Sequence, residues 1–267
     1  MKPGAVLGVD VGFSKTRAST AICLLSWSED EIRWSIRHFR ALEPERTNSI
    51  AALCGELPIL AAAFDGPLAT GLGIIGQYRL AEKMLTRRLG KTIGKPGQSN
   101  SPVGKLLNAA ANDLARIVVD VCNLDPATFP HAIHEKAIVE TFPTAFMGLM
   151  IDRPDALSAR RSDRSDLYFC HLIETKGIEA MLTALLPGRR SRQDLGGIAD
   201  HDDRAAFVAA IAALCVTAGN HVAVGDPNGW IALPPRRFIR PGPFAHLEAN
   251  AGELGQHSLR IYSPRQN

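Results

Sequence analysis

The sequence predicts an α/β fold in which a mixed sheet is flanked by helices. Two observations predict it. Residues 1–41 contain three strand-like segments joined by short polar turns, and the rest of the chain alternates short apolar runs with longer helical patterns. The first pattern is typical of antiparallel strands, and the second is typical of parallel strands that helices connect. We therefore expect both kinds of strand pairing in one sheet.

The first strands follow the hydrophobic pattern closely. Residues 5–12 and 17–27 are predicted strands joined by the turn Gly-Phe-Ser-Lys, and residues 31–41 alternate after the turn Ser-Glu-Asp-Glu. These segments predict an antiparallel meander. A helix is expected over residues 47–57. Residues 59–64 form a nearly continuous apolar run, which is typical of a buried parallel strand, and this strand is expected to end at Asp65.

The remaining elements alternate along the chain. Helices are expected over residues 78–89, 103–122, 144–150, 168–186 and 202–218, and a strand over residues 131–142 is expected to end near Glu140. A hairpin over residues 221–235 and a polar tail complete the chain. The sequence has no internal repeat and no linker. Residues 1–267 are therefore predicted to form one domain with loop insertions at about 90–102 and 151–167.

Composition limits the class of protein. The 267 residues, 46% of them hydrophobic, suffice for a substantial core, and no run of about 18 apolar residues occurs, so we expect a cytoplasmic protein without a membrane partner. Five cysteines lie in apolar stretches without C-x-x-C spacing, which indicates buried, reduced thiols rather than disulfides or a zinc site. The net charge is +3, with basic clusters at 87–91, 159–164, 188–192 and 234–240. Such clusters are either solvated loop charges or contacts to a phosphate backbone.

Four acidic positions carry the functional argument. Asp10, Asp65 and Glu140 each lie at the carboxyl end of a predicted strand, and Asp202, followed by Asp203, begins an apolar helix. Because open α/β sheets place their chemistry at the carboxyl ends of the strands, we expect these side chains to converge. Asp10 and Asp65 also suit turns, and Asp202 also suits a helix cap. Glu140 lies between apolar residues, where an unpaired acid is costly to bury.

The order of the elements is that of a ribonuclease H-like fold, and five short motifs follow one another along it. They are Gly8-Val9-Asp10, Phe64-Asp65-Gly66-Pro67 followed by Arg79 and Arg87-Arg88, Glu140-Thr141-Phe142-Pro143, Asp202-Asp203, and Gly225-Asp226-Pro227-Asn228-Gly229-Trp230-Ile231-Ala232-Leu233-Pro234. On these motifs the chain resembles domain-of-unknown-function family 429, predicted nucleases of ribonuclease H-like fold, over nearly its whole length. One position departs from the family pattern, because Ala205 stands where the family helix has a second aspartate.

The resemblance implies a divalent-metal-dependent nuclease that hydrolyses the phosphodiester bonds of DNA or RNA. Two cations about 3.5–4 Å apart serve the attacking water and the leaving oxygen in such sites, and carboxylates hold Mg²⁺ or Mn²⁺. The implied catalytic residues are Asp10, Asp65, Glu140, Asp202 and Asp203, of which all but Asp203 are the implied metal ligands, with Asp202 and Asp203 as alternatives for the helix position. The implied contacts to substrate phosphates are Lys15, Arg79, Arg87 and Arg88.

Two other functions stay open at the level of sequence. Asp10-Val11-Gly12 with Ser14-Lys15-Thr16 also resembles the first phosphate loop of the actin-like kinases and ATPases, Asp65-Gly66 resembles their second, and Leu195-Gly196-Gly197 resembles their adenosine loop. Those proteins duplicate the core, for which this chain is short. The departure at Ala205 also suits a catalytically inactive nucleic-acid-binding protein. A homodimer is compatible with the sequence too, because the apolar helix at residues 205–218 suits either a second subunit or its own sheet.

Overall fold

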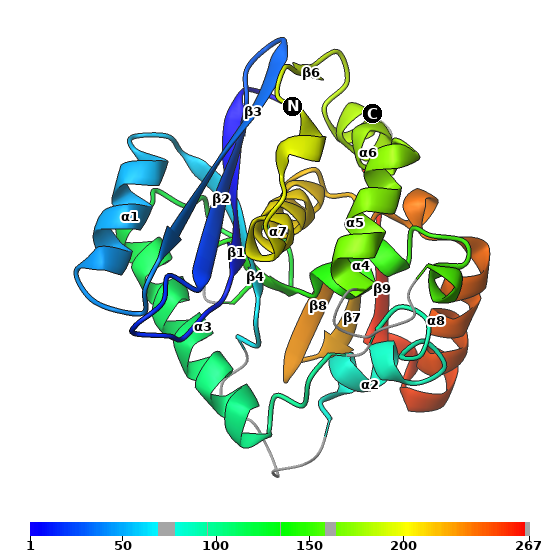
Figure 1. The fold of residues 1–267 in the computed structure, drawn as a ribbon. Coiled ribbons are helices and arrows are strands. Elements are labelled where there is room, and N and C mark those ends of the chain that lie inside the picture. The colour runs from blue at the N-terminus through cyan, green and yellow to red at the C-terminus, as the bar shows by residue number, and fades with distance from the viewer. Residues whose placement is uncertain (69–77, 95, 134, 158–163, 265–267) are drawn as a thin grey trace.

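A computed structural model describes residues 1–68, 78–94, 96–133, 135–157 and 164–264. These residues form one mixed sheet of nine strands flanked by helices, which confirms the predicted α/β class (Figure 1). The strands lie in the order β6-β3-β2-β1-β4-β5-β8-β7-β9. They are β1 (Gly4–Asp10), β2 (Thr20–Trp27), β3 (Glu31–Phe39), β4 (Ile59–Asp65), β5 (Ile138–Thr141), β6 (Arg190–Ser191), β7 (His221–Asp226), β8 (Gly229–Leu233) and β9 (Leu259–Tyr262).

The centre of the sheet forms as the hydrophobic pattern predicts. β1, β2 and β3 are an antiparallel meander, and β4 and β5 continue the sheet parallel to β1. β4 ends at Asp65 as expected. β5 is shorter than predicted, because the chain before it turns back so that Ile133 bridges Ile138. β5 pairs with β8 at two positions, so β8, β7 and β9 join the rest of the sheet through a narrow seam.

Helices cover both faces of the sheet (Figure 1). α1 (Glu45–Cys54) and α3 (Pro102–Val121) lie on one face, and α7 (His201–Thr217) lies on the other beside α4 (Pro143–Gly148), α5 (Arg164–Glu174) and α6 (Gly177–Leu185). α2 (Leu80–Thr86) and α8 (Pro241–Leu254) pack near β7. Short 3-10 turns lie at Pro154–Ala156, Leu195–Gly197, Arg236–Phe238 and Gln256–Ser258. None of the helices in the described part of the chain is long and apolar enough to cross a membrane.

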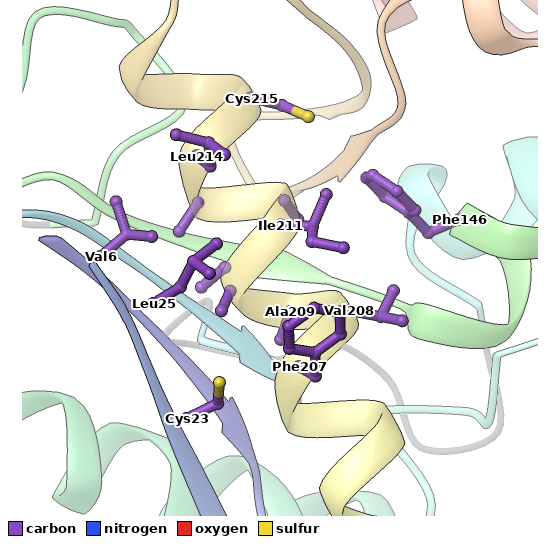
Figure 2. Packing of buried hydrophobic residues seen from close by; sticks show 14 of the residues in the cluster. Val6, Cys23, Leu25, Phe146, Phe207, Val208, Ala209, Ile211, Leu214 and Cys215 are labelled. Atoms are coloured by element: carbon purple, nitrogen blue, oxygen red, sulfur yellow. The ribbon is translucent and has the colours of Figure 1, made fainter. Parts of the chain in front are cut away.

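α7 is the centre of the largest buried cluster. Every residue from Ala205 to Val216 is buried, with the sheet on one side and α4 to α6 on the other. Figure 2 shows Val6 and Leu25 of the sheet on one side of α7 and Phe146 of α4 on the other. Gly8 on β1 allows this packing, because a Cβ at that position would lie 2.0 Å from the backbone nitrogen of Ala210. The glycine thus lets the α7 backbone touch the strand. Since its own chain covers both sides of α7, this helix offers no apolar face to a second subunit.

Two predicted segments differ from the structure. The helix expected over residues 168–186 is two helices, α5 and α6, because Lys176 between them has a left-handed backbone with φ 57°. The expected polar tail forms α8 and β9 instead, and Phe244, Leu247 and Ala251 give α8 a buried stripe with helical spacing. The other predicted helices begin and end within about three residues of the observed ones, the usual uncertainty of helix ends.

The two predicted loop insertions differ in how far the structure describes them. Residues 90–94 and 96–101 contain neither helix nor strand, as expected. Of the second insertion, residues 158–163 lie outside the described residues, and α5 begins at Arg164. Most of the basic cluster at 159–164 therefore lies outside the described residues as well.

The cysteines differ from the prediction in two ways. Cys54, at the end of α1, and Cys122, just after α3, form a disulfide with their Cα atoms 6.2 Å apart, so the expectation of five reduced thiols is wrong. The packing of α1 on α3 brings together two cysteines that are 68 positions apart, and no local spacing marks such a pair. Cys23 and Cys215 are buried thiols as predicted, whereas Cys170 is exposed.

Candidate carboxylate site

Asp10 and Asp65 end two neighbouring parallel strands. They are register partners in the β1–β4 ladder, so they lie opposite each other at the carboxyl edge of the sheet. Because side chains alternate along a strand, Asp10 is on the same face as Gly8, which faces α7. The structure therefore brings these two predicted carboxylates together beneath the first turn of α7.

α7 adds Asp202 from that first turn, and the Asp202 carboxylate, after burial and the charge of Asp65, raises the pKa of Asp10. Asp200 caps the helix, since its Oδ1 accepts a hydrogen bond of 2.9 Å from the backbone nitrogen of Asp202. Asp203 contacts a different element: its Oδ1 lies 2.5 Å from Nε2 of His38 on β3. Of the two helix candidates, Asp202 is thus the one that meets Asp10.

When ionised, the carboxyl groups of Asp65 and Asp202 each repel that of Asp10. Burial, and then the negative charges of Asp65 and Asp202, raise the pKa of Asp10 well above its ordinary value. Burial raises the pKa of Asp65 to about 7, and His201 acts in the opposite direction. A bound cation would relieve this repulsion, and oxygen donors from carboxylates are the ligands that Mg²⁺ and Mn²⁺ take. Carboxylate is therefore the donor type that a hard divalent cation requires.

Among the described residues, the group of acidic and histidine side chains whose ligand atoms lie close enough to share one metal ion is at the start of α7. One ligand atom from each of His38, Asp200 and Asp203 lies within 4.8 Å of the other two. Asp200 also raises the pKa of Asp10 through its negative charge, so the two groups share one electrostatic environment. His38 adds an imidazole, a ligand that transition-metal ions accept more readily than Mg²⁺ does.

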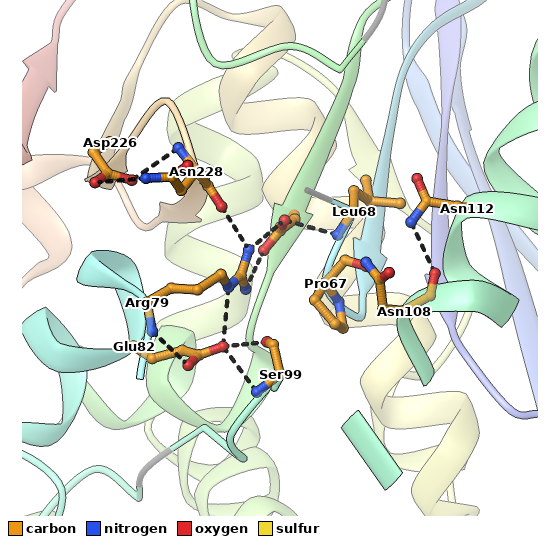
Figure 3. A network of polar contacts seen from close by, with 10 residues as sticks. Pro67, Leu68, Arg79, Glu82, Ser99, Asn108, Asn112, Asp226 and Asn228 are labelled. Atoms are coloured by element: carbon orange, nitrogen blue, oxygen red, sulfur yellow. Dashed lines mark hydrogen bonds and ion pairs between the residues drawn. The ribbon is translucent and has the colours of Figure 1, made fainter. Parts of the chain in front are cut away.

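Glu140 lies one strand further across the sheet and is held by Arg79. The guanidinium Nη1 and Nη2 atoms donate to the two carboxylate oxygens of Glu140 at 2.9 Å each, and the backbone nitrogen of Leu68 donates to Oε1 at 2.7 Å. Arg79 Nε donates to Glu82 at 3.0 Å, and the backbone nitrogen of Ser99 donates to the same Glu82 oxygen at 3.2 Å (Figure 3). Glu140 is 2% exposed and Glu82 is 1% exposed.

This network differs from two sequence expectations. Glu140 is expected to be a metal ligand, but the cation that neutralises it in this structure is the guanidinium of Arg79, which occupies both of its oxygens. Arg79 is expected to contact a substrate phosphate, but it is 8% exposed and its donors bond to Glu140 and Glu82. Burial explains both differences, because a buried acid needs a charged partner and the nearest one is an arginine.

The other expected phosphate contacts lie apart from the carboxylates. Lys15 is exposed in the loop that follows β1. Arg87 and Arg88 pair with Glu253 on α8, and Arg88 Nη1 also donates to Asn250 at 2.8 Å. These two arginines fasten α2 to α8.

The structure adds two residues that sequence reasoning missed. Asp200 precedes the predicted start of the helix, and an aspartate there is a recognisable N-cap signal. His38 is one of several polar side chains on β3, and nothing local marks it. Ala205, where the family pattern has an aspartate, is buried in α7 and supplies no ligand.

No protein-family model, no curated protein and no solved structure matches the chain. The function must therefore be argued from the residues of the site.

Proposed function

We propose that this chain is a Mg²⁺- or Mn²⁺-dependent nuclease of ribonuclease H-like fold, related to domain-of-unknown-function family 429. The observation that carries the proposal is the convergence of Asp10, Asp65 and Asp202 from two strand ends and one helix start. A buried carboxylate that two neighbouring carboxylates repel in the absence of a cation is suited to bind one.

The topology supports the finer fold assignment. The order β3-β2-β1-β4-β5 consists of an antiparallel meander followed by two parallel strands, and the helix that carries Asp202 crosses β1 at Gly8. This is the arrangement expected of a ribonuclease H-like core with its acidic residues at the carboxyl ends of β1 and β4.

The chemistry follows from the donor set. The bound cations would polarise the phosphodiester and activate a water for in-line attack. Asp10, Asp65 and Asp202 would hold those cations, and Asp200 fixes Asp202 by capping its helix. Asp203 and His38 lie beside them and extend the set of ligands to a second position. Glu140 and Arg79 act one strand away by tying the loop after Asp65 to β5 through Leu68.

The proposal is tested by cleavage of labelled single-stranded, duplex, hybrid and branched DNA and RNA with Mn²⁺ or Mg²⁺. We expect the wild-type protein to cleave at least one substrate and Asp10→Asn to lose about 100-fold or more of that activity, since a metal ligand is lost. Asp120→Asn, which changes an exposed aspartate on α3, is the matched control and should cleave normally. Equal cleavage by wild type and Asp10→Asn would refute the proposed site.

The same preparation separates the alternatives. A protein that binds Mn²⁺ and nucleic acid without cleaving any substrate would be the inactive binding protein. Thermal stabilisation by ATP with Mg²⁺, together with ATP hydrolysis, would identify the actin-like kinase or ATPase.

A further inference from the structure

A cavity of about 660 Å³ lies between α5, α6 and the segments that follow α4 and β8. Its described walls come from residues 150–157, the end of α5, the first turn of α6 and residues 237–240. None of these lining residues belongs to the carboxylate site or to the Glu140–Arg79 network. Its volume is in the range of sites that hold a small organic molecule. The cavity is therefore a candidate binding site separate from the carboxylates.

Positively charged side chains predominate among the described residues of its walls. Arg153, Lys176, Arg237 and Arg240 line the cavity, and Asp152 is the one acid that does. Asp152 is paired, because its Oδ1 lies 3.4 Å from Nε of Arg240. Arg153, Lys176 and Arg237 are exposed and have no acidic partner among the described residues. Three cations are thus accessible to an anion in the cavity.

The N-terminus of α6 adds backbone donors to the same cavity. Gly177 and Ala180 of its first turn line the cavity, and no side-chain hydrogen bond caps the helix. The first N–H groups of a helix have no partner within it, and together with the helix dipole they favour an anion. Glu179, the acid of this turn, lines a neighbouring cavity instead. The side chains and the helix end thus favour the same kind of ligand.

Lys176 stands where asparagine or glycine would be easier to accommodate. Its φ of 57° lies in the left-handed region, which is unfavourable for lysine. The tight connection of α5 to α6 has this conformation, and its turn is closed by the N–H of Lys176, which donates to the carbonyl oxygen of Ile173 at 3.0 Å. Lysine therefore gives the backbone no advantage at this position. What it adds there is a positive charge in the wall of the cavity.

From these observations we infer that this cavity binds the phosphate groups of a multiply charged anion. Guanidinium groups bond to phosphate oxygens through parallel N–H donors, and an ammonium group binds them as a point charge. The excess of positive side chains favours a ligand with more than one negative charge. Two sources have this chemistry: the backbone of a nucleic acid, and a free polyphosphate chain such as that of a nucleotide. The inference does not depend on the proposed nuclease activity.

Calorimetry on the metal-free protein tests the inference. The protein is titrated in EDTA with tripolyphosphate and with a single-stranded oligonucleotide. We expect at least one of them to bind below millimolar concentration, with an affinity that falls as salt is added. Binding of the oligonucleotide identifies the nucleic-acid backbone as the source, and binding of tripolyphosphate alone identifies a free phosphate compound. Binding of neither up to millimolar concentrations would overturn the inference.

A matched pair of variants distinguishes the cavity from general attraction to a basic protein. Arg237→Gln removes one charged donor from the cavity and should weaken binding by about 10-fold. Arg192→Gln makes the same change of charge at a side chain that is 80% exposed and does not line the cavity, so it should bind as the wild type does. Equal losses in the two variants would overturn the site.

Lys176→Asn separates binding from folding. Asparagine tolerates the left-handed region, so this variant should melt at the same temperature as the wild type or higher, while it binds the anion about 10-fold more weakly. Unchanged affinity in folded Lys176→Asn would contradict the inference. Asp10→Asn should bind the anion as the wild type does, and a loss of binding there would place the ligand at the carboxylates and overturn the cavity as its site.

Discussion

Replacing Asp65 with asparagine should stabilise the metal-free protein. Burial raises the pKa of Asp65 from 3.8 to about 7, so the folded state disfavours the ionised side chain. Each pH unit between these two values corresponds to 1.36 kcal/mol, which makes the ionised Asp65 unfavourable by about 4 kcal/mol above pH 7. Asparagine has nearly the same shape and carries no charge. Asp65→Asn should therefore raise the free energy of unfolding by about that amount at pH 8.

The direction of the pKa shift determines how the stability advantage of Asp65→Asn changes with pH. Because the folded-state pKa lies above the unfolded value, the wild type has its full share of stability below pH 3.8 and loses it as the pH rises through 7. The advantage of Asp65→Asn should therefore be largest at pH 8 and vanish toward pH 3.8. Urea unfolding in the presence of EDTA, from pH 3.5 to pH 8, measures it. Asp120→Asn, at an exposed position, is the control.

Metal should narrow the difference in stability between the two proteins. A cation at 100 times its Kd stabilises a protein that binds it by about 2.7 kcal/mol, and this gain should appear in the wild type and be reduced in Asp65→Asn. If Asp65→Asn is no more stable than the wild type at pH 8 without metal, the carboxylate is already neutralised within the fold. In that case the argument for a cation site at Asp65 fails.

Three further substitutions test contacts within the fold. His221 is 1% exposed and neither of its ring nitrogens has a hydrogen-bond partner, and burial lowers its pKa from 6.5 to about 3. Because the unfolded chain takes up the proton first, the protein should lose about 5 kcal/mol of stability as the pH falls from 6.5 to 3. His221→Phe should reduce this loss, which thermal melts at pH 7.5 and 4.5 measure. Arg79→Ala removes the guanidinium that neutralises the buried Glu140 and should cost about 3–5 kcal/mol in urea unfolding. Arg87→Ala, which removes an exposed ion pair with Glu253, should cost much less, and equal losses would contradict this account. Gly8→Ala places a Cβ in the α7 backbone and should destabilise by more than about 4 kcal/mol, and a thermal midpoint close to that of the wild type would show that the helix can move away.

The sequence predicts the parts of this fold that local patterns determine. The meander and β4 follow from alternation and from an apolar run, and β4 ends at Asp65 as predicted, before Gly66 and Pro67. β1 ends at Asp10, two residues before its predicted end. Asp202 and Asp203 cannot be told apart in this way, because adjacent residues of a helix differ by about 100° in direction and the docking angle of α7 is a tertiary property.

Interaction partners that are distant along the chain cannot be identified from the sequence, because tertiary packing decides which residues meet. Glu140 is recognisable as an acid that needs a partner, but Arg79 stands 61 positions earlier, and a metal ion satisfies the same requirement. The Cys54–Cys122 pair depends on how α1 packs on α3. α8 was missed because its apolar stripe is carried by few large side chains among glycine, alanine and proline.

The narrow seam between β5 and β8 divides the molecule into two parts that should differ in their resistance to local unfolding. Two residue pairs of the sheet cross it, and the buried bonds of Arg79 to Glu140 reinforce it from α2. Segments joined by few contacts open as cooperative units before the whole protein unfolds. Backbone amides of β7, β8 and β9 should therefore exchange with deuterium earlier than those of β1 and β4. Asp10, Asp65 and Asp202 lie on the slower side of this boundary, so the carboxylate site should keep its geometry while β7, β8 and β9 open.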